Sequence, residues 1–392
     1  MQRINNTNIS ICASDIVRQD FENCVSNTII YSDHLGSKVY DQAIILPTSD
    51  DMWPMKGGLR DKYGNWVEDA VAWYNEDTTP INTDCVVYRN ENVIYLGSLT
   101  SIYGHTFTDD ISKVWYILLH KEKLNKIRVV YSAYWNDNVI PNHLLAFFDL
   151  LGFDFREFEN VKQITRFKSV VIPEKAFIRQ RDNYGCCKIH TVMNDVYDLI
   201  INNSVNRNQL DMVFPRKIYL TRTKLNANGR RDFGEERLEQ VFMEEGFSIV
   251  SPENYSIDEQ ISLMQHCEVL ASTEGSISHN SIFLNKSARQ IVLKKGDWLN
   301  RYQVGLSLLR GNKTVFVTAH HSTPLKKSKT PHAGPFYICI TQELEDLLGR
   351  KLKISNMWYD PSWWYYYFFR SRKFLISLAR SSFVMKFRKL KS

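Results

Sequence analysis

Residues 217–294 contain the runs KIYLT (217–221), EERLEQVFMEE (235–245), FSIV (247–250), SIDE (256–259) and EVLAST (268–273). The β-rich runs alternate with runs whose apolar residues recur at helical spacing. Gly246 is typical of the residue that ends a helix, and Ser256 with Glu259 forms a capping box that begins the next helix, which ends near His266. We expect a further helix from Ser276 to about Asn285 and a last strand at 290–293. This alternation predicts a parallel, doubly wound sheet.

The first half of the chain alternates in the same way, although less regularly. Strands are expected around Val93–Leu99, at Lys126–Ser132 and at Ser169–Ile172, with helices near Thr106–Leu119 and at Pro141–Leu151. Residues 31–80 predict an elaboration or long loops. Because 392 residues exceed the usual size of one domain, we expect two α/β domains, residues 1–205 and residues 206–350, followed by a tail of residues 351–392.

The composition is that of a globular protein, with 44% hydrophobic and 23% charged residues. The net charge of +6 comes from the end of the chain, because residues 361–392 hold eight Lys or Arg and no Asp or Glu. Residues 1–360 are therefore nearly neutral, which argues against a nucleic acid as partner.

The cysteines and the N-terminal sequence favour a cytoplasmic protein. Seven cysteines are scattered without a CxxC pattern, which is typical of a reducing compartment and of a chain without structural zinc. The first twenty residues lack the basic flank and apolar run of a secretory signal. No segment offers about 18 uninterrupted apolar residues, the length that a membrane-spanning helix needs.

Two loops are expected to meet at the carboxyl edge of the predicted sheet, where parallel sheets bind ligands. The basic or phosphate-binding residues in and after these loops are Arg222, Lys224, Arg230, Arg231, Thr273, Gly275 and Ser276. Guanidinium groups bind phosphate oxygens in two places at once, and a helix beginning near Ser276 adds amides, so the loops predict a diphosphate site. The alternative is that Arg222 and Lys224 are solvated loop charges. The GxGxxG and P-loop signatures do not occur in the sequence.

His105 and Asp109 form a second candidate site within Gly104–Trp115. Residues four apart share one face of a helix, and a carboxylate beside an imidazole can accept a proton from a hydroxyl group. The alternative is a purely structural role. In that case Asp109 stabilises the first turn of the helix, and His105 is a capping residue of the helix or a packing residue.

The stretch Lys217–Phe283 closely resembles the C-terminal part of glycosyltransferase family 61, with its YLSR-like strand end, NEEEL-like helix start, GF, PE and GSxxxN turn. Gly104–Trp115 resembles the family's GHF-type motif, so the resemblance covers roughly residues 90–345. It implies two Rossmann-like domains in a GT-B-like arrangement with a central cleft. It also implies an inverting sugar transfer from a nucleotide donor, without a cofactor or an obligatory metal, in the assembly of bacterial surface polysaccharides.

The resemblance assigns roles to seven residues. Arg222, Glu235, Gly275, Ser276 and Asn280 match donor-side positions, and His105 and Asp109 match the acceptor-side motif. Three positions depart from the pattern, because Gly234 replaces Asn, Lys113 replaces Arg and Glu274 replaces a His before Gly-Ser. We therefore keep Glu274 as a candidate base of second rank, with holding a sugar hydroxyl or Arg222 as its alternative role. The sequence has no DxD triplet, which agrees with metal independence.

The tail combines the aromatic run WWYYYFF (363–369) with basic residues. Such a composition suits an anionic membrane surface, and the alternative is that the tail packs back on the N-terminal domain. The partners expected are thus a nucleotide-sugar donor, a glycan or lipid-linked acceptor, and the inner face of the plasma membrane through residues 361–392. A binding module without turnover and a membrane scaffold remain as alternative functions.

Overall fold

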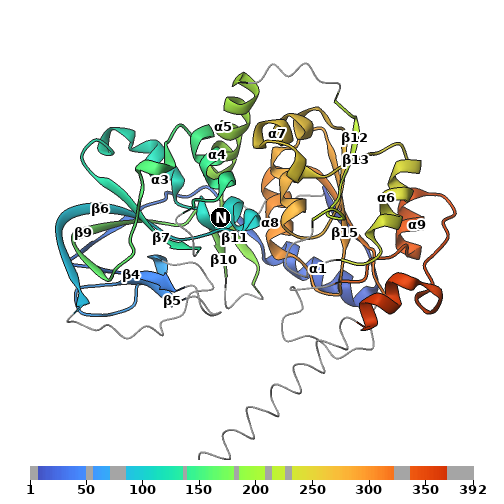
Figure 1. The fold of residues 1–392 in the computed structure, drawn as a ribbon, viewed down its shortest axis with the longest axis horizontal. Helices are drawn as coiled ribbons and strands as arrows, with labels where there is room; N and C mark the ends of the chain where they lie inside the picture. The colour runs from blue at the N-terminus through green and yellow to red at the C-terminus, as the bar shows by residue number, and fades with distance from the viewer. Residues whose placement is uncertain are drawn as a thin grey trace, which may run out of the picture.

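A computed structural model of the chain describes residues 8–49, 56–70, 85–135, 139–180, 185–207, 214–225, 232–321 and 336–368. Two large β-sheets with their helices lie side by side, and β10 and β11 lie between them (Figure 1). Of the residues singled out above, Arg230, Arg231 and the tail from residue 369 onward lie outside the described ranges.

The second half of the chain builds a six-stranded parallel sheet. Its strands are β12 (Lys217–Leu220), β13 (Ser248–Val250), β14 (Val269–Thr273), β15 (Arg289–Lys294), β16 (Lys313–Thr318) and β1 (Ile9–Cys12). They lie in the order β13-β12-β14-β15-β16-β1. The parallel α/β arrangement predicted from residues 217–294 is confirmed. No strand was predicted at Ile9–Cys12, and β1 joins this sheet although it comes from the other end of the chain.

Of the helices described in this half, the first two were predicted from the sequence and the others were not. They are α6 (Glu235–Glu244), α7 (Ile257–His266), α8 (Arg301–Arg310) and α9 (Gln342–Leu348), and α1 (Asp15–Asn27) joins them from the N-terminal segment. The predicted capping box is present, because Ser256 and Glu259 bond each other's main-chain amides. The segment Ser276–Phe283 (η7) is a 3-10 helix instead of an α-helix. Its residues from Ile277 onward are buried. The side-chain amides of Asn280 and Gln290 donate to the main-chain carbonyls of Ile277 and Ser278, which an α-helix would use for its own hydrogen bonds.

The first half builds a seven-stranded mixed sheet. Its parallel strands are β6 (Val87–Thr100), β7 (Arg128–Tyr134), β8 (Glu159–Asn160) and β9 (Thr165–Pro173). The antiparallel strands β3 (Ser37–Asp41), β4 (Ile44–Ser49) and β5 (Lys56–Arg60) extend it on the β9 side. These three strands come from the region where an elaboration or long loops were predicted. A smaller sheet joins β10 (Phe177–Arg179), β11 (Cys187–His190) and β2 (Ile29–Tyr31).

The helix predicted near Thr106–Leu119 is divided into three pieces. These are α2 (Tyr103–His105), a π-helical turn η3 (Thr106–Asp110) and α3 (Val114–Leu119). The other helices of this half are α4 (Asn142–Leu150) and α5 (Val192–Arg207).

One hydrophobic core connects the two halves. Phe107 of η3 and Phe147 of α4 both contact Phe283 of η7, with ring centroids 5.5 and 5.9 Å apart. The same buried cluster includes Tyr197 of α5 and Leu270 of β14. The halves are therefore packed against each other here, beside the segments that carry the candidate catalytic motifs.

The described part of the tail packs on the second half. Residues 361–368 are helical, and Trp363 and Tyr366 are buried against Tyr337 and Cys339. Tyr365 and Phe368 are exposed. Within the part of the chain that the structure describes, every helix is too short or too polar to cross a lipid bilayer.

Candidate functional site

The His105–Asp109 pair follows directly from the end of β6. The strand ends at Thr100, and α2 and η3 then turn so that both side chains lie on one face. His105 Nδ1 and Asp109 Oδ2 are 2.6 Å apart, and Thr108 Oγ1 donates to the same carboxylate oxygen at 3.0 Å. Burial alone would lower the pKa of His105, but its hydrogen bond to Asp109 and the negative charge there outweigh burial, so this pKa is raised. The pair has the geometry of a proton acceptor oriented by a carboxylate.

Tyr302, on the first turn of α8, completes the surroundings of this pair. Its hydroxyl donates to Asp109 Oδ1 at 3.4 Å, and its ring lies edge-on to His105 with centroids 5.7 Å apart. The guanidinium of Arg179 lies over the other side of the same ring, 5.5 Å from its centroid. Sequence analysis missed Tyr302 and Arg179, since no local pattern connects them to a histidine at least 70 residues away.

The acceptor-side motif and the GSxxxN turn are in direct contact. A Cβ added at Gly104 would lie 2.6 Å from Ser276 Oγ and 3.0 Å from His279 Cδ2, so only glycine fits between them. Next to it, the Tyr103 hydroxyl donates to Asn280 Oδ1 at 2.6 Å. The two segments, 170 residues apart in the sequence, thus lie against each other and bring His105 close to the turn that begins at Gly275.

The Gly275 turn leaves the carboxyl end of β14. Gly275 has φ = 136°, a backbone conformation that side chains disfavour, and Lys295 Nζ lies 3.8 Å from the place of a Cβ there. The hydroxyl of Thr273 at the strand end is buried and has no hydrogen-bond partner. A turn with an open glycine and a nearby ammonium is suited to the approach of an anion.

The loop after β12 begins at the same edge of the sheet. Leu220 pairs with Ser272, so Arg222 and the Gly275 turn follow neighbouring parallel strands. Glu235 lies beneath this loop, almost fully buried; it accepts from Tyr219 OH at 3.1 Å and from the main-chain amide of Arg222. Burial raises the pKa of Glu235 to about 7. Glu235 therefore holds the Arg222 loop from below, while Lys224 is exposed.

Glu274 is fully buried and faces α8. Its Oε1 accepts from the main-chain N–H of Asn300 at 2.7 Å, and its Oε2 lies 3.7 Å from Lys294 Nζ without a hydrogen bond. Burial raises the pKa of Glu274. Asn300 is the N-cap of α8, so this carboxyl group fixes the start of the helix that carries Tyr302.

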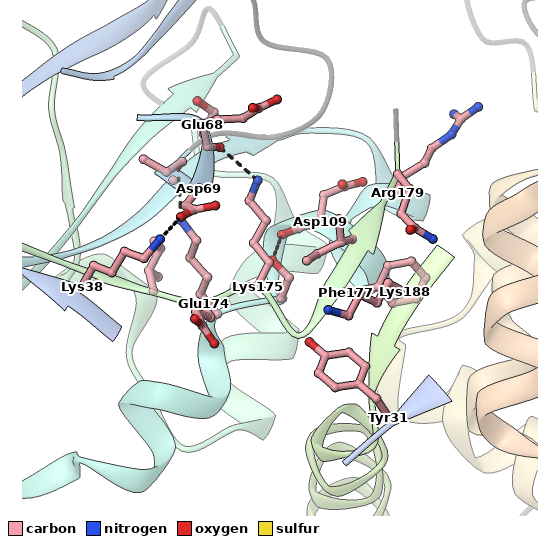
Figure 2. A pocket seen from close by; sticks show the side chains of 18 of the residues that line it. Tyr31, Lys38, Glu68, Asp69, Asp109, Glu174, Lys175, Phe177, Arg179 and Lys188 are labelled. Atoms are coloured by element: carbon pink, nitrogen blue, oxygen red, sulfur yellow. Dashed lines mark hydrogen bonds and ion pairs between the residues drawn. The ribbon is translucent and has the colours of Figure 1, made fainter. Parts of the chain in front are cut away.

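Asp109 also lies on the wall of a cavity of about 720 Å³ in the first half of the chain (Figure 2). The wall includes residues from β2, β3, β6, β10 and the segment before β10. Its charged members, besides Asp109, are Asp33, Lys38, Glu68, Asp69, Lys113, Glu174, Lys175, Arg179 and Lys188. Tyr31 and Phe177 add aromatic surface. Polar groups combined with aromatic rings are suited to a sugar-containing ligand.

Comparison with known proteins identifies one matching family. The family model described as Glycosyltransferase 61 matches residues 63–291, more than half of the chain, and this range contains both motif segments. No curated protein matches the chain.

Proposed function

The chain belongs to the glycosyltransferase 61 family, and from this premise we propose that it is an inverting, metal-independent enzyme that moves a sugar from a nucleotide donor to an acceptor hydroxyl. One observation carries the proposal: Gly104 of the His105–Asp109 segment fits directly against Ser276 of the predicted diphosphate turn. A proton acceptor and an anion-binding turn in contact are what this reaction requires.

In the proposed reaction, the His105–Asp109 pair takes the proton of the acceptor hydroxyl. The acceptor oxygen then forms a bond to the anomeric carbon from the face opposite the leaving group. The bond from that carbon to the diphosphate oxygen breaks, and the nucleoside diphosphate leaves with the electron pair. Arg222, Lys224 and the main-chain amides that follow Gly275 would stabilise its charge as it develops. As predicted from the sequence, we also propose that Arg230, Arg231 and Thr273 bind the donor.

The setting of the reaction is also a proposal. We propose a glycan or lipid-linked acceptor of bacterial surface polysaccharide assembly, and a position at the inner face of the plasma membrane. The support is the tail, in which the exposed Tyr365 and Phe368 precede eight basic residues at 370–391. On the family resemblance we also propose a GT-B-like cleft between residues 1–205 and 206–350, with β1 and α1 counted with the second sheet that they join.

The test is transfer from a panel of nucleotide sugars, with thermal shift by nucleoside diphosphates as a separate measure of donor binding. Asp109→Asn should lower kcat by about 10²–10⁴-fold and leave the nucleotide shift unchanged. Arg222→Ala should abolish both transfer and the shift, with the circular dichroism spectrum unchanged. Asp154→Asn, an exposed carboxylate that caps a 3-10 turn, serves as the matched control.

Two results would contradict the proposal. If the Asp109→Asn variant turned over at the wild-type rate, the His105–Asp109 pair would not be the base of the reaction. A nucleotide shift in the wild-type protein without transfer or hydrolysis of any donor would indicate a binding module instead of an enzyme.

A further inference from the structure

Three lysines, Lys38, Lys113 and Lys175, line the Asp109 cavity together with the carboxyl groups of Glu68, Asp69 and Glu174. Lys38 Nζ lies 2.6 Å from Asp69 Oδ2, and Lys175 Nζ donates to the main-chain carbonyl of Glu68 at 3.5 Å (Figure 2). The hydrogen bond from Lys38 and the positive charges of all three lysines, Lys113 included, lower the pKa of Asp69. Asp69 thus serves as a shared counter-charge for more than one ammonium group.

Lys113 is the most unusual of the three. Its side chain is only 1% exposed, and its Nζ donates to Ala70 O at 3.3 Å and lies 5.8 Å from the ring centroid of Tyr95. Among the described residues, no carboxylate lies within ion-pair distance of this nitrogen. Burial and the positive charge of Lys175 lower the pKa of Lys113 well below its ordinary value. Burying an ammonium group without a paired anion is costly.

We propose that this cavity holds the acceptor by an anionic group, a phosphate or a carboxylate, which pairs with Lys113 and Lys175 while the reacting hydroxyl lies at the His105–Asp109 pair. The inference rests on the proposed function, since it assigns the substrate class of the same site. An entering anion supplies the counter-charge that Lys113 lacks, and Lys113 takes up a proton as the anion binds. A neutral acceptor would supply no such counter-charge and would gain no ion pair with Lys113.

The other charges of the cavity fit this arrangement. Glu174 is engaged with the main-chain N–H of Gly36 at 3.0 Å, and Lys188 Nζ lies over the ring of Tyr31, 4.6 Å from its centroid. Asp109 is held by His105 and Tyr302. On this wall Lys113 is therefore a basic group without a carboxylate partner among the described residues, while the other end carries Asp109 of the proton-accepting pair, and an acceptor with one acidic group has a defined orientation between them.

The experiment compares glucose 6-phosphate, glucuronate and glucose as probes of the full-length protein by calorimetry at low salt. Either or both charged probes should bind at least about tenfold more tightly than glucose, which corresponds to about 1.4 kcal/mol. The charged probe that binds identifies the source as phosphate or carboxylate. Titrations in buffers of different ionisation enthalpy should show net proton uptake on binding, because an anion beside Lys113 favours its charged form.

Two cavity variants and one control sharpen the test. Lys113→Met keeps the buried stem and should abolish both the preference for the charged probe and the proton uptake. Lys175→Gln should reduce the preference even if Lys113→Met fails to fold. Lys286→Gln, at an exposed lysine three residues after η7 in the other half, should change neither. Equal affinity for glucose and both charged probes in the wild-type protein would overturn the inference.

Donor binding separates this inference from the proposed function. Transfer and nucleotide shifts without any preference for anionic probes would end the inference and leave the glycosyltransferase proposal intact. Tight binding of an anionic probe without any nucleotide shift or transfer would end the glycosyltransferase proposal and leave the cavity as an anion-binding site that is no acceptor site.

Discussion

Two adjacent carboxyl groups on η3 have different environments and therefore different chemistry. Asp109 bonds His105 and borders the cavity. Asp110 is fully buried and accepts from the Thr100 amide at 3.1 Å and from its hydroxyl at 3.4 Å. Burial raises the pKa of Asp110 to about 8, so that it stays protonated at neutral pH and supports the turn. The two adjacent side chains of the π-helical turn thus lie in different surroundings and have different roles.

The pH dependence of transfer should report His105. Only the unprotonated ring can accept the hydroxyl proton, and Asp109 raises the pKa of His105 above its ordinary value of about 6.5. We expect kcat/KM to fall as pH decreases, with a midpoint above about 6.5, and His105→Gln to lose this limb together with most of the rate. A stopped assay between pH 5 and 9 measures both. A wild-type rate that is constant over this range would show that His105 does not titrate in the reaction.

At the scale of elements, α8 connects the candidate site to the end of β14. Glu274 holds the N-cap Asn300, Tyr302 reaches Asp109, and Gln303 Oε1 accepts from His279 Nδ1 at 3.0 Å. The first turn of α8 therefore contacts both motif segments. Because the carboxyl group of Glu274 has no exposed surface, we expect it to act on the site through this helix.

Substitution of Glu274 distinguishes a positioning role from the role of a base. Glu274→Gln keeps an oxygen that accepts from Asn300, so transfer should stay within about threefold of wild type. Glu274→Leu leaves that buried N–H without a partner, which costs about 1–3 kcal/mol, and kcat should fall at least about tenfold with the nucleotide shift retained. Steady-state kinetics measures both. A loss in Glu274→Gln as large as in Asp109→Asn would make Glu274 a base.

The sequence predicts elements well where their signals are local. The capping box at Ser256 and the strand that ends at Thr273 need only neighbouring residues, and both are confirmed. The 3-10 form of Ser276–Phe283 and the edge strand Ile9–Cys12 were missed, because each depends on contacts with distant segments. The same reason explains the site. Motifs indicated His105 and Ser276, while the contact of Tyr302 with Asp109 spans 193 positions and leaves no local pattern.

At the scale of the whole molecule, the N-terminal segment is part of the second sheet and of the site's support. β1 pairs with β16, Phe21 of α1 packs on Phe316 with ring centroids 5.4 Å apart, and Asp20 forms an ion pair with Arg301 at 2.8 Å. Arg301 begins α8, which carries Tyr302. The start of the chain thus reinforces the helix that contacts Asp109, and the fold cannot be divided into two independent stretches of sequence here.

Phe21 is the residue through which this reinforcement is best measured. Its side chain is 5% exposed and fills the space between α1, β16 and α8, so Phe21→Ala should lower the free energy of unfolding by about 3–5 kcal/mol. Urea denaturation should show a lower midpoint with an unchanged slope. Ile16→Ala, on the exposed face of the same helix at 82% exposure, should cost less than about 0.5 kcal/mol. If both variants unfolded at the wild-type midpoint, α1 would not be an integral part of the second half, and its link to α8 through Asp20 would contribute nothing to the site.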